Sequence, residues 1–187
     1  MCCMATFEAV LMGNEIFSNA ARAVELYEKS RFGEKEKGNS KVVYMHEEAL
    51  YLVKKGNMNV VNSSYNTMTE HELTKKLLRL DKRFLTRFNV YRDLRDKGYI
   101  VKSALKFGGD FRVYEKGKKV GASHAKWVCF SASEKDNLSA QDFAAKNRVA
   151  HATKKNGLLA IVDSENDVSY YEMSWKKVVY ICMTLKK

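Results

Sequence analysis

The sequence predicts a mixed α+β protein made of two consecutive units. Helical and strand patterns alternate along its 187 residues, and no internal repeat or low-complexity segment occurs. The charge balance changes in the middle: residues 1–83 carry 13 Lys and Arg against 11 Asp and Glu, whereas residues 84–187 carry 20 against 11. A chain of this length can form two small domains. We therefore expect a small α/β domain at 1–80 and, at 81–187, a mixed sheet flanked by helices.

Short apolar runs bounded by Gly, Asn and Ser indicate the strands of the first unit, and apolar stripes at helical spacing indicate its helices. The expected order is strands at 7–11 and 15–17 around a Gly13-Asn14 turn, a helix capped by Ser18 and ending before Gly33, a loop at 32–40, a strand at 42–44, a helix at 46–55 and a strand at 60–61. The spacing Thr69-x-x-Glu72 is a capping box and opens a third helix.

In the second unit, apolar residues from Phe84 onward predict a helix that stops at Gly98. A second capping pattern, Ser139-x-x-Asp142, predicts another helix. The continuous apolar run at 158–162 is typical of a strand buried on both faces. The remaining expected elements are strands at 99–106, 111–114, 124–130, 168–173 and 178–183, a tight turn at 107–110 and an acidic loop at 163–167.

Net charge and the distribution of apolar residues indicate the kind of partner and the cellular location of the protein. The chain carries a formal charge of +11 at pH 7. Its basic second half indicates an anionic partner, with nucleic acid as the first candidate, although excess lysine can also serve only solubility. No apolar run is long enough for a transmembrane helix, and the first residues lack the basic and apolar regions of a secretion signal. We therefore expect a cytoplasmic protein with no membrane partner.

Cysteine spacing and missing motifs exclude several kinds of site. The cysteines at 2, 3, 129 and 182 form no Cys-x-x-Cys pair and have no His at ligand spacing, so we expect free thiols. The carboxylate-x-Lys pattern of metal nucleases, the Gly-x-x-x-x-Gly-Lys phosphate loop and the Gly-x-Ser-x-Gly hydrolase elbow are all absent. These observations favour anion binding with no metal and no other cofactor.

RNA can be cleaved without a metal when its own 2′-hydroxyl attacks the neighbouring phosphate. The reaction needs a base for the hydroxyl, an acid for the departing 5′-oxygen and a cation for the developing charge. Tyr, His and Lys side chains can supply these three functions. The basic half contains many Tyr and Lys residues but only two histidines, His124 and His151, and either one could instead be structural.

Six segments of the chain together resemble a known family. They are 23–27 (AVELY), 48–56 (EALYLVKKG), 91–102 (YRDLRDKGYIVK), 106–114 (KFGGDFRVY), 124–128 (HAKWV) and 148–155 (RVAHATKK). In order and spacing they resemble the tRNA-splicing endonuclease family, most of all its archaeal catalytic subunit, over nearly the whole chain. The resemblance implies a nuclease-type carboxy-terminal domain and an enzyme that cuts precursor tRNA at both exon–intron junctions of a bulge–helix–bulge. It also implies that no metal is needed and that the products carry 2′,3′-cyclic phosphate and 5′-hydroxyl ends.

The same resemblance implies a catalytic triad. Tyr114 closes the Phe-Gly-x-x-Phe-x-x-Tyr motif and corresponds to the general base on the 2′-hydroxyl. His124 opens the His-x-Lys motif and corresponds to the general acid for the 5′-oxygen. Lys155 ends an Arg-x₆-Lys segment and corresponds to the group that stabilises the pentacoordinate phosphate, with Lys154 as the alternative one position away. His151 matches no catalytic position and is interpreted as structural.

The resemblance further implies RNA-binding and assembly residues. Arg148 matches the position that holds a bulged base through cation–π stacking, and Trp175 is a candidate for the other side of that base or, equally, a packing residue. The family works as a tetramer, or as a pseudo-tetramer of fused or mixed subunits, because one substrate has two cut sites. A single chain with both domains and the triad resembles the homotetrameric members, which implies a homo-oligomer here, most simply a tetramer. Asp163, Glu165 and Asp167 would then contact a basic cleft of another subunit, or else form a solvated turn.

Three rival functions remain open. The chain could be an RNA-binding or structural subunit of a mixed endonuclease assembly that is not self-sufficient, although such subunits typically lose the triad. It could be a basic RNA-binding protein without catalytic activity, or a metal-dependent DNA nuclease. Cleavage of RNA by the purified chain in the presence of a chelator would distinguish all three from the endonuclease.

Overall fold

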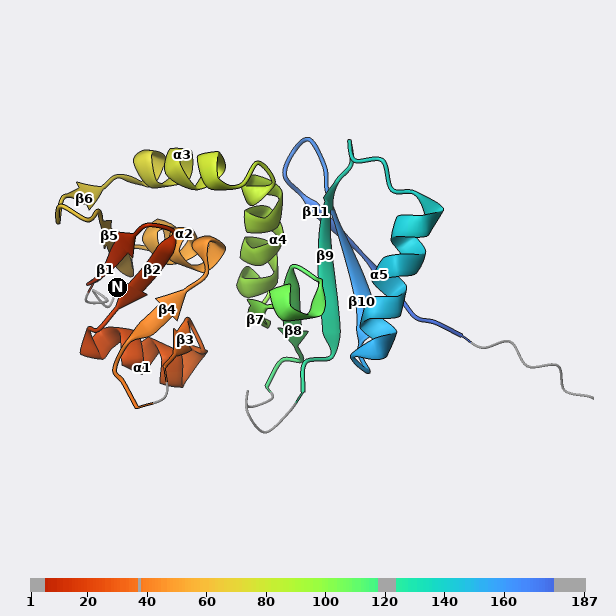
Figure 1. Cartoon of the computed structure of the whole chain (residues 1–187), viewed down its shortest axis with the longest axis horizontal. Coiled ribbons are helices and arrows are strands. Elements are labelled where there is room, and N and C mark those ends of the chain that lie inside the picture. Colours follow the sequence, from red (N-terminus) through yellow and green to blue (C-terminus); the bar gives the residue numbers. More distant parts are fainter. Residues whose placement is uncertain (1–5, 37, 118–123, 177–187) are drawn as a thin grey trace, which may run out of the picture.

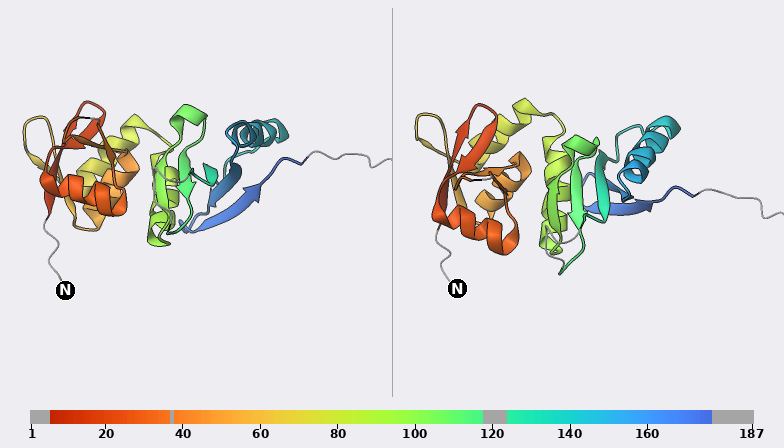
Figure 2. Two further views of the ribbon diagram at one scale, coloured as in Figure 1. Left: turned by 90° about the horizontal axis from the view of Figure 1, so that it is seen from below. Right: turned by 60° about the horizontal axis from the view of Figure 1, so that its bottom comes forward.

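The computed structural model of the protein describes residues 6–36, 38–117 and 124–176 (Figures 1 and 2). These residues form two β-sheets and five α-helices. The two sheets lie on either side of helix α4 (Phe84–Asp96), which is the vertical helix at the centre of Figure 1. The predicted mixed α+β class is therefore confirmed.

The amino-terminal sheet has six strands in the order β3-β4-β2-β1-β5-β6. β1 and β5 pair in parallel, and the other neighbours are antiparallel. Alternation along β1 buries Phe7, Ala9 and Leu11 on one face, as expected for a strand with one face on the core. The elements of this unit are β1 (Phe7–Met12), β2 (Glu15–Ser18), α1 (Ala21–Ser30), β3 (Glu34–Lys35), β4 (Val42–Tyr44), α2 (His46–Lys54), β5 (Met58–Val61), β6 (Thr67–Met68) and α3 (Glu70–Leu80).

The prediction that Ser18 caps α1 is wrong. The N-cap residue is Ala20, which makes no side-chain capping bond. The Ser18 hydroxyl instead donates to the carbonyl oxygen of Glu8 on the neighbouring strand, at 2.5 Å, and accepts from the Ala20 amide at 3.2 Å. The Ser18 oxygen therefore accepts from an amide that precedes the first helical residue, Ala21, and not from an amide inside the helix. The sequence also missed the two-residue strands β3, inside the predicted loop at 32–40, and β6.

The carboxy-terminal sheet has five strands in the order β11-β10-β9-β8-β7. β9 and β10 pair in parallel, and the other neighbours are antiparallel. α4 and α5 flank this mixed sheet, as predicted (Figure 1). The elements that follow α4 are β7 (Ile100–Ser103), a short 3₁₀ helix (Leu105–Phe107), β8 (Phe111–Tyr114), β9 (Trp127–Ser133), α5 (Ala140–Ala152), β10 (Asn156–Val162) and β11 (Val168–Met173).

Two predicted strand boundaries are wrong in this unit. The strand expected at 99–106 ends at Ser103, because the next residues form the 3₁₀ helix. The strand expected at 124–130 begins at Trp127 and continues to Ser133, where β10 pairs with it along its whole length. The strand expected at 178–183 lies outside the described residues.

Both predicted capping boxes are confirmed. The Thr69 hydroxyl accepts from the Glu72 amide while the Glu72 carboxylate accepts from the Thr69 amide, and Ser139 and Asp142 make the same reciprocal pair. Each box satisfies backbone N–H groups that a helix start leaves without an intrahelical partner. These local patterns therefore fix where α3 and α5 begin.

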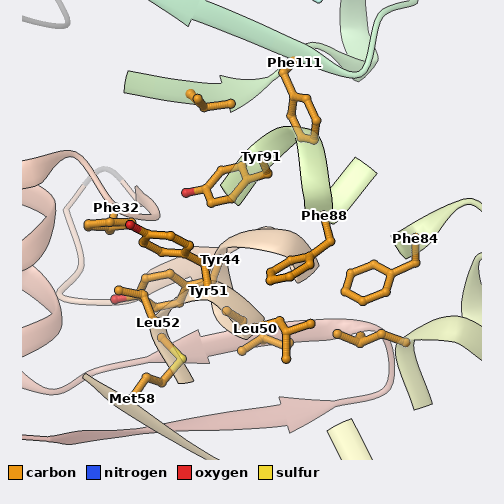
Figure 3. Packing of buried hydrophobic residues seen from close by; sticks show 14 of the residues in the cluster. Phe32, Tyr44, Leu50, Tyr51, Leu52, Met58, Phe84, Phe88, Tyr91 and Phe111 are labelled. Carbon is orange, nitrogen blue, oxygen red and sulfur yellow. The ribbon is translucent and has the colours of Figure 1, made fainter. Parts of the chain in front are cut away.

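The main core lies where α4 packs against both sheets. Figure 3 shows Tyr91 of α4 between Phe111 of β8 and the tyrosines of the amino-terminal unit, and Phe88 directed toward Leu50 of α2. The ring centroids of Tyr91 and Phe111 are 5.9 Å apart, and those of Tyr91 and Tyr51 are 5.8 Å apart. One aromatic helix face thus joins the two sheets.

Two further expectations concern membranes and thiols. Among the described helices, none combines the length and apolar composition that a bilayer crossing requires. Cys129 is a buried free thiol, and burial raises its pKa well above the ordinary value. The other three cysteines lie outside the described residues.

Candidate active site

The strand order brings three predicted site residues to one edge of the carboxy-terminal sheet. β8 ends at Tyr114, and its antiparallel pairing of Val113 with Trp127 puts the start of β9 beside that end. β10 runs parallel to β9 with Asn156 opposite Trp127, so its start lies at the same edge. This is the lower edge of the sheet in Figure 1. We call it the triad edge, because Tyr114, His124 and Lys155 all lie there.

Backbone hydrogen bonds tie the three segments of the triad edge together. The Lys126 amide donates to the Val113 carbonyl at 3.0 Å, and the Asn156 amide donates to the Lys126 carbonyl at 3.0 Å. Val113 precedes Tyr114, Asn156 follows Lys155, and Lys126 lies two positions after His124. The relative positions of the three segments therefore depend on the strand ladder rather than on side-chain contacts.

Tyr114 and His124 differ in exposure. Tyr114 is the last residue of β8, pairs with Ile100 of β7 and is 6% exposed. His124 precedes β9 and is exposed to solvent. Within the described part of the chain, no hydrogen bond joins either side chain to another residue.

The turn after α5 separates Lys155 from Lys154. The Lys154 amide donates to the His151 carbonyl at 2.9 Å and the Lys155 amide donates to the Ala150 carbonyl at 3.0 Å, which is the bond pattern of a Schellman turn. Lys154 occupies the left-handed position of this turn, with φ of 55°, and is exposed. Lys155 leads directly into β10 at the triad edge.

The Lys155 side chain is held by two contacts. Its ammonium donates to the Thr153 carbonyl at 2.9 Å and lies 5.5 Å from the centre of the Phe107 ring. The residue is half-buried. A cation fixed in this way can meet an anion with little loss of side-chain freedom, whereas the exposed Lys154 makes no ion pair or hydrogen bond through its ammonium among the described residues.

Arg148 and Trp175 lie near the same end of α5. Arg148 is exposed on α5, and His151, one turn later on the same face, has its ring centroid 5.0 Å from that of Trp175. Trp175 is 54% exposed, so its indole is not a core residue. His151 is also exposed, and its interpretation as structural stays a prediction. The i, i+3 spacing from Arg148 is the sequence signal that could have assigned it to this surface.

The acidic loop lies at the opposite edge of the sheet from the triad edge. The Asp163 carboxylate accepts from the amides of Glu165 and Asp167, both at 2.9 Å, so it closes the turn itself. Asn166 adopts φ of 68°, and its side-chain oxygen accepts from Asn89 of α4 at 2.8 Å. Glu165 and Asp167 are exposed and make no ion pair with another described residue. These two carboxylates are the ones that a partner could reach.

Cation-binding residues complete the description of the site. In residues 6–36, 38–117 and 124–176, no three His, Cys, Asp or Glu side chains are arranged to hold a metal ion.

The triad edge itself carries basic side chains, including Lys116, Lys126 and Lys155. One of them is paired, because the Lys126 ammonium lies 2.6 Å from a Glu115 carboxylate oxygen. The arrangement suits binding of an anion together with transfer of protons.

Two family models match the chain. Residues 7–74 match the amino-terminal domain of tRNA intron endonucleases, and residues 84–170 match their catalytic carboxy-terminal domain. The chain is 43% identical over 171 residues to a tRNA-splicing endonuclease of Pyrococcus abyssi, covering 91% of this chain and 96% of that protein. It is 44% identical over 136 residues to the one of Nanoarchaeum equitans, covering 70% and 86%. The corresponding protein of Methanothermobacter thermautotrophicus is 32% identical over 166 residues, covering 88% and 95%.

Proposed function

The chain belongs to the tRNA intron endonuclease family and is an endonuclease, and we propose that it cuts precursor tRNA at both exon–intron junctions with Tyr114, His124 and Lys155 as catalytic residues. The substrate would be recognised through the shape of a bulge–helix–bulge rather than through its sequence. The observation that supports this most is the triad edge, where the end of β8 and the starts of β9 and β10 bring the segments that carry Tyr114, His124 and Lys155 to the same end of the sheet.

The proposed reaction is an internal transesterification of the lyase type. Tyr114 removes the proton of the 2′-hydroxyl, whose oxygen forms a bond to the adjacent phosphorus. The bond from phosphorus to the 5′-oxygen breaks, and His124 gives that oxygen a proton. Lys155 balances the extra negative charge on the phosphate in the transition state. The products are a 2′,3′-cyclic phosphate and a 5′-hydroxyl, and no step requires a metal or another cofactor.

Further residues would bind RNA and build the assembly. Arg148 and Trp175 would hold a bulged base, supported by their exposure near one end of α5. We propose a homotetramer acting in the cytoplasm, in which the acidic loop contacts a basic cleft of another subunit through Glu165 and Asp167 while Asp163 shapes the turn. The two domains would divide near residues 80 and 81, between α3 and α4.

Cleavage of a bulge–helix–bulge RNA in EDTA tests the proposed function. We expect the purified chain to make two cuts and leave cyclic phosphate ends. Tyr114→Phe, His124→Ala and Lys155→Ala should each slow single-turnover cleavage by about 10²- to 10⁴-fold and leave RNA affinity nearly unchanged. Product ends are identified by phosphatase and kinase treatment.

Lys154→Ala is the matched control, since it removes the same charge one residue away. It should cleave at close to the wild-type rate, because Lys154 is exposed and its ammonium makes no contact with another described residue, whereas that of Lys155 is held by Thr153 and Phe107. Wild-type rates in all three triad variants, or a larger loss in Lys154→Ala than in Lys155→Ala, would contradict the assignment. Cleavage that stops in EDTA and returns with magnesium would contradict the metal-independent chemistry.

A further inference from the structure

The turn that joins β7 to β8 lies on the same face of the carboxy-terminal sheet as α5. A Cβ atom on Gly109 of this turn would come within 2.4 Å of a Val128 methyl carbon on β9, so the backbone approaches the sheet as closely as glycine allows. Val128 packs with Val149 of α5, which identifies the face. The turn is also bonded to β9, because the Asp110 amide donates to the Cys129 carbonyl at 3.0 Å. The turn therefore has a fixed position beside α5.

The ring of Phe107, in the same turn, has two cations beside it. The Lys155 ammonium and the central carbon of the Arg112 guanidinium each lie 5.5 Å from the ring centre. Distances within about 6 Å are those at which the face of an aromatic ring attracts a cation. Arg112 pairs with Val128, and alternation along β8 puts Tyr114 on the same face as Arg112. Phe107 therefore lies on the face that carries Tyr114, and it contacts Lys155 directly.

The Arg112 guanidinium is itself held by two acceptors. Its Nε–H donates to the Ser103 carbonyl at 2.8 Å, and a terminal nitrogen lies 3.6 Å from a carboxylate oxygen of Glu34, on the amino-terminal unit. Phe107 is 36% exposed, so core packing alone does not hold its ring. A fixed guanidinium on one side and the Lys155 ammonium on the same ring therefore limit how the ring can move.

The Lys155 ammonium is held without a carboxylate. Lys126, at the same edge, is paired with Glu115 at 2.6 Å. The partners of Lys155 among the described residues are neutral, namely the Thr153 carbonyl and the Phe107 ring. A carboxylate would offset the positive charge that a phosphate needs in the transition state. A carbonyl and a ring restrict the ammonium but leave its full charge available.

We propose that Phe107 is a positioning residue for the cleavage reaction. Its ring holds the Lys155 ammonium in place for the cleaved phosphate, and Arg112 holds the ring. The proposal rests on the proposed function, since it assumes that Lys155 stabilises the phosphate in the transition state. A charge that is already in place needs no reorganisation during the reaction, so loss of the ring should lower the rate of the chemical step and leave RNA affinity nearly unchanged.

Single-turnover cleavage of a bulge–helix–bulge RNA over a range of protein concentrations tests this proposal. The measurement separates the maximal rate from the protein concentration that gives half of it. Phe107→Leu should lower the maximal rate about tenfold, as expected for loss of a partly desolvated cation–π contact, and should change the half-maximal concentration less than about twofold. Phe107→Tyr keeps an aromatic ring and should stay within about threefold of the wild-type maximal rate.

Two further measurements distinguish positioning from packing. In a Lys155→Ala background, Phe107→Leu should cause no further loss of rate, because the ring then has no ammonium to hold. A fluorinated phenylalanine at position 107 keeps nearly the same shape but has a weaker negative face, so its maximal rate should lie between those of the wild type and Phe107→Leu. A side chain that only fills space would show additive losses and no dependence on fluorine.

Leu105→Ala is the matched control, because Leu105 belongs to the same 3₁₀ helix and is 72% exposed. It should cleave at the wild-type rate. Thermal melting identifies any variant that does not fold, and the fluorinated ring then takes the place of Phe107→Leu.

The outcomes separate this proposal from the proposed function. Wild-type cleavage by Phe107→Leu, additive losses in the double variant, or a fluorinated ring that is as active as phenylalanine would overturn the positioning role and leave the proposed function intact. No cleavage by the wild-type chain, or an unchanged rate in Lys155→Ala, would contradict both.

Discussion

Helices α4 and α5 are both 13 residues long and pack against the same sheet, but they differ in how much they bury. Cys129 of β9 belongs to the cluster that contains α4, whereas its neighbour Val128 packs with Val149 of α5, so the helices cover opposite faces. α4 buries six residues, while α5 buries only Ala150. Length and sheet contact therefore do not determine the role of a helix, because what covers its other side also matters.

The outer side of α4 is covered by the amino-terminal unit. Phe88 and Tyr91 of α4 pack on residues of α2 and the first sheet (Figure 3). On α5, by contrast, Phe143, Arg148 and His151 are exposed among the described residues. A helix enclosed between two sheets serves stability, whereas a helix with one free face can serve binding.

Buried charged side chains near α4 are further evidence that this helix serves stability. Glu48 of α2 and Lys102 of β7 are 1% and 5% exposed, and the Tyr91 hydroxyl donates to Glu48 at 3.3 Å. Burial raises the pKa of the Glu48 carboxyl and lowers that of the Lys102 ammonium, while the attraction between them opposes both shifts. Lys102 also donates to the Gly33 carbonyl of the amino-terminal unit. Polar groups this far from water need these partners, so they fix how α4 lies between the sheets.

Truncating one phenylalanine on each helix should give the largest difference. Phe88→Ala on α4 removes a ring that is 3% exposed, and it should lower the free energy of unfolding by about 3–5 kcal/mol. Phe143→Ala on α5 removes a ring that is 42% exposed and should change it by no more than about 0.5 kcal/mol. Urea unfolding followed by circular dichroism measures both values.

Equal losses of unfolding free energy in Phe88→Ala and Phe143→Ala would contradict the difference between the two helices. They would mean that Phe143 is covered in the assembled protein, for instance by another subunit. Repeating the measurement over a hundredfold range of protein concentration separates the two cases, since stability that depends on assembly rises with concentration.

The sequence predicted the features of this fold that depend on nearby residues. Both capping boxes, at Thr69 and Ser139, involve residues three positions apart and were correct. The cap at Ser18 was wrong because β2 continues through Ser18, which bonds to Glu8 on the paired strand, and the helix begins only at Ala21. The start of β9 at Trp127 depends on its pairing with β10, which is equally invisible to a local pattern.

For the candidate site too, the sequence indicated the residues but not how the fold brings their segments together. Motif resemblance indicated Tyr114, His124 and Lys155, but only the strand order shows that their segments share an edge. Motif alignment favoured Lys155 over Lys154, and that choice stays a prediction; the left-handed backbone at Lys154 gave no sequence signal, because the residue is not glycine.

Replacing one arginine on each helix should show that α5, and not α4, contributes to RNA affinity. Arg148→Ala on α5 should weaken RNA binding about tenfold, as expected for loss of a base-stacking cation, without changing thermal stability. The probe is a bulge–helix–bulge RNA with 2′-deoxy nucleotides at both cut positions, which can bind but cannot be cleaved. Arg92→Ala on α4 is the charge-matched control, because Arg92 is half-buried and donates to the Asn166 carbonyl. Its affinity should remain within about twofold of the wild type at the same salt concentration. Equal losses at several salt concentrations would show that only net charge matters.

The smallest expected effect concerns the carboxy-terminal end of α4, which is tied to α2. The Tyr51 hydroxyl donates to Asp96 at 2.9 Å and the Lys55 ammonium lies 3.0 Å from it, whereas α5 ends in its own Schellman turn. Burial acts to raise the pKa of Asp96, but the hydrogen bonds from Lys55 and Tyr51 outweigh it and lower the pKa. Burial and Asp96 raise the pKa of Tyr51 to about 12, so its hydroxyl remains a donor throughout the acid range.

Because the folded state lowers the pKa of Asp96, its carboxylate stabilises the fold above the unfolded value of 3.8, and this contribution is lost as the pH falls through the folded-state pKa. Asp96→Asn should therefore be less stable than the wild type at pH 7 by under about 1 kcal/mol, since the carboxylate is 44% exposed and screened. The difference should vanish by about pH 2. It should also be smaller in a Tyr51→Phe background, where one of the two donors is missing. A difference that is the same at pH 2 and pH 7 would mean that Asp96 acts by shape alone, and that charge contributes nothing to holding α4 between the sheets.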